Sequence, residues 1–256
     1  MTAPEREPGR PYLLVDAEGF LVPAAKASEH DIEWEPDDWQ RICRHGDAIA
    51  LFQDAMADLM AAIPNFSLAL VLGDRTTFRY GVYPQYKGNR KKEQKVPGWP
   101  ALVERIEALA RSCGWMVWRL PNVEADDACG ILASRRDIIA SKDKDLLTIP
   151  GYVYRGGEIQ LQTQMDADLA FYGQTLIGDK SDNYPGCPGI GEKGAEKVLA
   201  GCSTEAEMWQ AVVKAYKKAG KSAAEAIVQA RCARILRPGE YDMAESRPIL
   251  WRPPVA

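Results

Sequence analysis

The chain has 256 residues, 46% of them hydrophobic, and a formal net charge of −4, which indicates a globular protein with a sizeable core and excludes a disordered or fibrous chain. No apolar stretch reaches the roughly 18 residues of a membrane span, and residues 1–10 lack the apolar core of a signal peptide, so we expect no membrane partner. The six cysteines form no Cys-x-x-Cys pair and there are two histidines, so we expect the reduced thiols of a cytoplasmic protein and no zinc site.

Three apolar runs along the chain each end in aspartate. They cover 12–16, 67–74 and 137–143, and the last is followed by Asp145. Runs this rich in Leu, Val and Ile indicate buried parallel strands, whose carboxyl ends are where ligands collect in open α/β sheets. A single aspartate at such a place can equally be a turn residue or a helix cap. Its recurrence predicts that the acids converge at one edge of a sheet.

The segments between these runs are predicted mainly as helices. Apolar residues at helical intervals predict helices over 36–62 and 99–113, packed on the sheet with their aromatic residues in the core. Residues 116–118 are predicted as a further strand. The segment 205–236 is rich in Ala and carries four lysines, and we interpret it as helices whose basic face is a solubilising surface.

Two more segments, 123–127 and 178–183, add further carboxylates. The nine candidate metal ligands are Asp16, Asp74, Glu124, Asp126, Asp127, Asp143, Asp145, Asp179 and Asp182. Carboxylates gathered in one cleft repel one another unless cations neutralise them, and hard oxygen donors favour Mg²⁺ or Mn²⁺. Once nine such charges are set aside, the net charge changes from −4 to +5. The acidic total therefore does not exclude a nucleic-acid partner.

The segment from Arg75 to Lys95 is the most basic part of the chain. It holds seven cations against one acid, with four aromatic residues interleaved. Cations flanked by aromatic rings suit a strand of phosphates and unstacked bases, although a solvated basic loop has the same composition. Because the segment begins next to Asp74, we favour substrate binding. The residues assigned to DNA binding here are Arg75, Tyr86, Lys91 and Lys92.

A second binding element is predicted where 183–191 leads into a helix. Pro and Gly favour a tight turn, and a helix whose first amides are free follows it. Such geometry binds phosphate without reading bases. A lone Gly-Ile-Gly is usually a plain turn, but its place directly after the acids of 178–183 makes the motif more specific. The residues assigned to it are Gly189, Ile190, Gly191 and Lys193.

These motifs together resemble the structure-specific 5′ nuclease family, which includes flap endonucleases and the 5′ nuclease domains of bacterial DNA polymerases. The order of motifs matches from about residue 11 to residue 200. The ending, with Ala233-Arg-Ile-Leu, Glu240-Tyr and Leu250-Trp-Arg-Pro, is similar to that of the 5′ to 3′ exonucleases of short-tailed phages. The resemblance would place the protein in the cytoplasm of a bacterial host cell.

The resemblance implies an α/β fold with two parts. Residues 11–177 would form a PIN-like 5′ nuclease core, in which a central, mainly parallel twisted sheet has helices on both faces and 75–98 form a short basic arch. Residues 178–252 would form a helical region with a helix-two-turn-helix DNA-binding element. In some family members this element binds K⁺. Only about twenty residues separate Arg79 from Trp99, so the arch either encloses a threaded strand or is an open ridge.

The resemblance also implies an activity and assigns residues to it. The expected enzyme is a magnesium-dependent 5′ to 3′ exonuclease on duplex DNA that also removes 5′ flaps and RNA primers, leaving a 5′-phosphate and a 3′-hydroxyl. In the family, one metal is held by the acids that match Asp16, Asp74, Glu124 and Asp126. The second metal is held by those that match Asp126, Asp143, Asp145 and one of Asp179 or Asp182. Asp127 would contact these ligands without binding a metal itself. The catalytic basic residues correspond to Lys87, Arg90 and Arg79. Replication proteins and RNA–DNA hybrids are further expected partners.

The pattern departs from the family at one place, and two other functions remain open. Many relatives carry an arginine shortly after the first aspartate, whereas 19–25 contain none, so one contact to the 5′ end or a phosphate is not expected. A PIN-type metal-dependent ribonuclease shares a carboxylate-ended sheet but lacks the glycine hairpin. A catalytically inert DNA-end-binding protein would use the same surfaces without turnover.

Overall fold

A six-stranded sheet forms the centre of the computed structural model, which describes residues 6, 9–90 and 96–254. The strands are β1 (Tyr12–Asp16), β4 (Ser67–Leu72), β5 (Met116–Arg119), β6 (Ile138–Ala140), β7 (Gly151–Arg155) and β8 (Glu158–Gln162), in the order β5-β4-β1-β6-β7-β8. All neighbours are parallel except β7 and β8. The three runs that end in aspartate supply the adjacent strands β4, β1 and β6. Their carboxyl ends therefore share one edge, as predicted.

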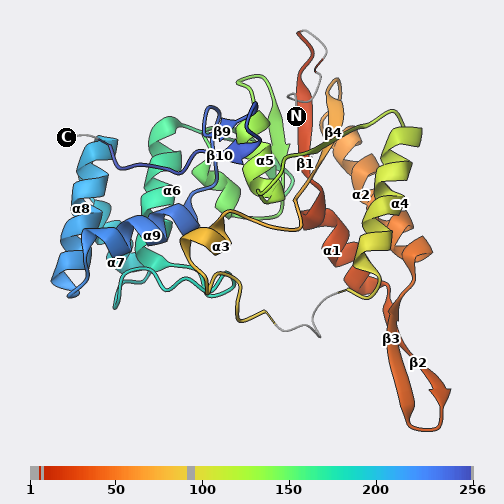
Figure 1. Cartoon of the computed structure of the whole chain (residues 1–256). Helices are drawn as coiled ribbons and strands as arrows, with labels where there is room; N and C mark the ends of the chain where they lie inside the picture. The colour runs from red at the N-terminus through yellow and green to blue at the C-terminus, as the bar shows by residue number, and fades with distance from the viewer. Residues whose placement is uncertain (1–5, 7–8, 91–95, 255–256) are drawn as a thin grey trace.

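Helices cover both faces of this sheet (Figure 1). On one face, α1 (Ala17–Ala27), α2 (His45–Ala62) and α4 (Trp99–Ser112) pack against side chains such as Leu13 and Val15. On the other face, α5 (Ala125–Leu132) packs against the alternate positions, which include Leu14. Successive strand side chains point to opposite faces, so a continuous apolar run fits a sheet buried on both sides. The mainly parallel α/β fold is confirmed.

The last third of the chain forms a separate helical core. It contains α6 (Gln164–Ile177), α7 (Glu192–Leu199), α8 (Glu205–Lys218) and α9 (Ala223–Ala233), and the helices predicted over 205–236 are confirmed. The rings of Phe171, Tyr172 and Trp209 surround Trp251 at centroid distances of 5.4, 6.3 and 5.3 Å. The tail, which includes the short pair β9 (Tyr241–Asp242) and β10 (Arg247–Pro248), is thereby fixed to the helices. Short helical turns α3 (Arg79–Val82) and η2 (Asp145–Thr148) complete the described elements.

The prediction of one helix over 36–62 is wrong in its first part. A hairpin of β2 (Glu29–Glu35) and β3 (Asp38–Cys43) precedes α2, which begins at His45, and it projects from the body of the molecule (Figure 1). The tip turns at Asp37, whose φ is +68°. Trp39 was expected in the core but is 60% exposed, whereas Phe52 of α2 is fully buried as expected.

All six cysteines are free thiols, as predicted. None of the helices in the described ranges is long and apolar enough to cross a membrane.

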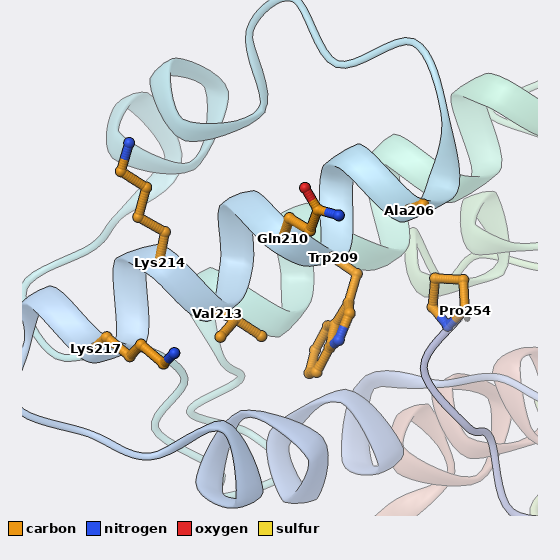
Figure 2. Close-up of a pocket in the computed structure, with 7 residues that line it drawn as sticks. All are labelled: Ala206, Trp209, Gln210, Val213, Lys214, Lys217 and Pro254. Atoms are coloured by element: carbon orange, nitrogen blue, oxygen red, sulfur yellow. The ribbon is translucent and has the colours of Figure 1, made fainter. Parts of the chain in front are cut away.

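A hollow of about 520 Å³ lies on α8 (Figure 2). It is lined by Ala206, Trp209, Gln210, Val213, Lys214, Lys217 and Pro254. Figure 2 shows that six of these residues follow one face of α8, with Pro254 of the tail beside them. Because none of them is a predicted ligand, this hollow is not the predicted metal site.

The packing of α5 depends on a glycine. A Cβ at Gly130 would lie 2.2 Å from the carbonyl oxygen of Leu236 and 2.8 Å from Cδ1 of Ile149, whereas a Cβ at Gly173 in α6 would meet nothing within 4 Å. We expect Gly130→Ala to lower the free energy of unfolding by about 1–3 kcal/mol, and Gly173→Ala to raise it by about 0.5–1 kcal/mol because alanine favours a helix. Urea unfolding of both variants measures these free energies. Equal changes in the two variants would contradict the prediction.

Candidate metal and nucleic-acid site

The first two aspartates lie at the carboxyl ends of adjacent strands. Asp16 ends β1 and is 7% exposed, and Asp74 follows β4. The carboxylate of Asp16 accepts hydrogen bonds from the hydroxyl of Ser141 (2.8 Å) and the amide of Gly19 (3.4 Å), so it also caps α1. Asp74 accepts from the amides of Arg75 and Asn122, both at 2.7 Å. These contacts fix both carboxylates at the sheet edge.

The start of α5 contributes the densest group of acids. Glu124 and Asp127 form a capping box, in which each side chain accepts from the other residue's backbone amide. Asp126 lies between them, and the three side chains offer carboxylate oxygens within 4.8 Å of one another. Burial, followed by the charges of Asp127 and Glu124, raises the pKa of Asp126 well above its usual value. An ionised Asp126 therefore needs a cation nearby.

Asp127 already has a cationic partner. Its two oxygens accept from Arg79 at 2.5 and 2.8 Å, and the amide of Leu236 donates to it at 3.1 Å. Both side chains are buried, with Arg79 1% and Asp127 0% exposed. Arg79 also donates to the carbonyl oxygens of Cys232 and Arg234 and, at 3.2 Å, to Glu124. These contacts connect α3, α5 and the end of α9.

Two basic residues at the foot of the predicted arch face the acids. Lys87 forms an ion pair with Glu124 and lies 3.7 Å from Asp182, and Arg90 donates to Asp182 at 2.8 Å. Burial alone would raise the pKa of Glu124, but the cations of Arg79 and Lys87 hold it below its usual value. The predicted metal ligands and the basic residues predicted to act on phosphate thus lie next to one another.

Tyr86 has a different position from the one expected. It was assigned to DNA binding, yet it is 3% exposed and its hydroxyl contacts Glu124 at 2.8 Å and Asp182 at 2.6 Å. A ring so deeply packed has no free face for a base, so its assignment as a stacking residue is corrected. The hydroxyl instead connects two of the predicted metal ligands.

The loop that carries Asp179 and Asp182 packs against the basic segment. The backbone amide of Lys87 donates to the carbonyl of Asp182 (2.8 Å), and the side-chain amide of Asn89 donates to the carbonyl of Lys180 (2.7 Å). The loop closes between Gly178 and Gly186, where an added Cβ at either residue would come within 2.4 Å of the other residue's amide nitrogen. This close approach connects α6, the acidic loop and the glycine hairpin.

The remaining acids follow β6. Asp143 is exposed, and one of its oxygens accepts from the amide of Asp145 at 2.9 Å. Burial, with a further contribution from the charge of Asp143, raises the pKa of Asp145 to about 6. Asp179 also raises it, which shows that the loop after α6 faces the end of β6. All nine predicted ligands therefore lie on the segments that meet at this edge.

The raised pKa of Asp145 makes a pH dependence testable. Between pH 4 and 6 the folded protein binds a proton at Asp145 that the unfolded chain releases, so its contribution to stability is present at low pH and lost as pH rises through about 6. We expect the metal-free wild type to lose stability relative to Asp145→Asn between pH 4 and 7, by at most about 3 kcal/mol. Thermal unfolding in a chelator across this range measures it, and parallel curves would contradict it.

The other predicted DNA-binding residues have mixed positions. The side chain of Arg75 is exposed, as are Gly189, Gly191 and Lys193, whereas Ile190 is partly buried in the helical core. Gly191 precedes α7, and no side chain caps the amides of that helix. Lys91 and Lys92 lie outside the described residues.

Two residues of the site were not predicted. Ser141 donates to Asp16, and Glu18 in the first turn of α1 has its pKa raised by burial and by the charges of Asp16 and Glu124. Glu18 could have been found from its place two residues after a strand-ending aspartate. Ser141 carries no comparable signal, because a serine before an acid is common in turns.

A parallel sheet whose edge gathers carboxylates beside basic residues defines a class of phosphoryl-transfer hydrolase. Residues 12–164 match the family model described as 5′-3′ exonuclease, N-terminal resolvase-like domain. The exodeoxyribonuclease of Enterobacteria phage T3 is 30% identical, with coverage of 94% of this chain and 92% of the relative. The exonuclease of Escherichia phage T7 is 29% identical over 94% of this chain and 93% of the relative. The chain therefore belongs to the 5′-3′ exonuclease family and is a 5′-3′ nuclease.

Solved structures show the same fold. The T5 D15 protein crystallised with metal ions superposes with a TM-score of 0.58 at 14% identity, with coverage of 87% of this chain and 91% of that one. The catalytic core of Rad2 in complex with a DNA substrate gives a TM-score of 0.55 at 17% identity, with coverage of 78% and 64%.

Proposed function

We propose that the chain is a magnesium-dependent 5′ to 3′ exonuclease on duplex DNA that also removes 5′ flaps and RNA primers, including those of RNA–DNA hybrids. The observation that carries this proposal is the meeting of acids from β1, β4, α5, the end of β6 and the 179–182 loop at one sheet edge, with Lys87 and Arg90 among them. The names of the phage relatives, an exodeoxyribonuclease and an exonuclease, support it.

The donor set fits two hard divalent cations. Asp126 has one hydrogen bond in the described structure, from the amide of Asp127, and its neighbours Asp127 and Glu124 are also acids. We assign one cation to Asp16, Asp74, Glu124 and Asp126, and the other to Asp126, Asp143, Asp145 and one of Asp179 or Asp182. Mn²⁺ has the same ligand preference and should replace Mg²⁺. Bound there, the cations would lower the pKa of an attacking water and stabilise the leaving oxygen, leaving a 5′-phosphate and a 3′-hydroxyl.

The basic residues then position the substrate. Lys87 is close enough to the acids to meet a phosphate held beside them, and Arg90 lies at the exposed rim. Arg79 is buried against Asp127, so we propose that it orients the acids and does not contact DNA. Residues 75–98 would form the arch beside the single strand.

The glycine hairpin would hold the duplex. Exposed residues at 189, 191 and 193 precede and begin α7, whose uncapped amides suit a backbone phosphate. We propose that α6, the hairpin and α7 form the helix-two-turn-helix element, and that it binds K⁺ as in some relatives. These contacts would read the backbone and not the bases.

Duplex DNA labelled separately at its 5′ and 3′ ends tests the activity. With Mg²⁺, we expect the 5′ label to be released early in mononucleotides or short oligonucleotides. The 3′-labelled strand should shorten progressively on a denaturing gel. A parallel reaction with a 5′-flap substrate measures the related activity. Failure to cleave either substrate would contradict the proposal.

A further inference from the structure

Glu18 lies beside the proposed cation site. It belongs to the first turn of α1, two residues after Asp16, and its side chain reaches the backbone that follows β4. The amide of Gly73 donates a hydrogen bond to it, and a Cβ at residue 73 would lie 3.1 Å from its Oε1 atom. The absence of a side chain at Gly73 therefore gives this carboxylate room above the ends of β1 and β4.

The charged groups that act on Glu18 are other members of the site. Asp16 and Glu124 repel its negative charge, and Lys87 attracts it. Among the residues in the described ranges, Glu18 has no salt bridge. Lys87 is itself paired with Glu124, so the lysine that attracts Glu18 is already shared with a second carboxylate. Such an arrangement is costly unless a further cation lies between them.

The place of Glu18 in its helix does not account for this orientation. An acid in the first turn interacts favourably with the helix dipole even when its side chain extends into water. Glu18 instead extends across to Gly73, toward Asp16 and Glu124. This direction brings like charges together, which the helix alone does not require.

We propose that Glu18 is an additional carboxylate of the cation position bounded by Asp16 and Glu124, which it contacts directly or through a metal-bound water. This inference rests on the proposed function, because it assumes that a divalent cation binds there. Its consequence is that Glu18 strengthens cation binding in the free enzyme, before DNA arrives.

Binding of Mn²⁺ alone, followed by the electron paramagnetic resonance of the free ion without DNA, tests the role of Glu18. We expect Glu18→Gln to weaken the tighter Mn²⁺ site by about 10- to 100-fold, the range found for residues that support metal ligands. Glu158→Gln, at the exposed start of β8, makes the same charge change away from the site and should stay within about twofold of wild type. Glu18→Asp keeps the charge and should lie between these two.

The outcomes separate this inference from the proposed function. Wild type that binds no Mn²⁺ would overturn both. Wild type that binds Mn²⁺, with Glu18→Gln equal to it, would overturn only the role of Glu18, and a lower melting temperature without a change in affinity would show that Glu18 stabilises α1 alone. If Glu18→Gln does not fold, the ratio between Glu18→Asp and Glu158→Gln decides, and equal affinities would overturn the inference.

Discussion

Replacement of Asp126 by Asn is expected to reduce the rate of DNA cleavage by about a thousandfold or more. In the proposed site this carboxylate is shared by both cations, and loss of several kcal/mol of transition-state stabilisation corresponds to a factor of that order. The metal-free variant should be at least as stable as wild type. Asp127 and Glu124 both repel the charge of Asp126, and asparagine removes that repulsion.

Single-turnover cleavage of 5′-labelled duplex in Mg²⁺ measures the rate, and thermal unfolding in a chelator measures stability. Asp58→Asn is a matched control, because it makes the same change at an exposed position of α2. Cleavage by Asp126→Asn at the wild-type rate would show that the two-metal assignment is wrong. A slow variant that is also unfolded would leave the rate without meaning, which is why both measurements are needed.

The sheet and its acidic edge could be predicted because their signals are local. The runs that became β1, β4 and β6 are short, continuously apolar and followed by aspartate. Since parallel strands are buried on both faces, such runs indicate both the strand and its direction. Convergence of the acids then follows because parallel strands run in the same direction, so their carboxyl ends share one edge of the sheet.

The hairpin shows where a local pattern misleads. Trp39, Ile42 and Ile49 fall at intervals that suit a helix, and this spacing concealed the alternation of His30 and Ile32 with acids in β2. The pair Pro36 and Asp37 was a competing signal, because both residue types are common in turns. The spacing of apolar residues alone could not decide between a helix and a hairpin here.

The positions of Arg79 and Tyr86 could not be obtained from composition. Both belong to a segment rich in cations and aromatic residues, which suits a DNA-binding surface, but tertiary packing turns these two inward. Arg79 meets Asp127, 48 residues away in sequence, and Tyr86 meets Asp182, 96 residues away. Only the fold brings such partners together, so the pattern could identify a basic segment without showing which side chains face solvent.

Replacement of Arg79 by Met is expected to lower the free energy of unfolding by about 3–5 kcal/mol, because it leaves the buried Asp127 without its cation. Urea unfolding measures the change. Arg75→Met is a suitable control, since its side chain is exposed and surface changes of this kind cost about 0.5 kcal/mol or less.

The double variant Arg79→Met/Asp127→Leu distinguishes charge pairing from packing. If the cost comes from an unpaired charge, removing Asp127 as well should recover part of the stability lost in Arg79→Met. If the double variant is less stable than either single variant, the geometry of the salt bridge and of the amide of Leu236 that donates to Asp127 matters more than charge. In both outcomes Glu124 loses the hydrogen bond that Arg79 donates at 3.2 Å. The variant that folds best should therefore still bind Mn²⁺ with an affinity that differs from that of wild type.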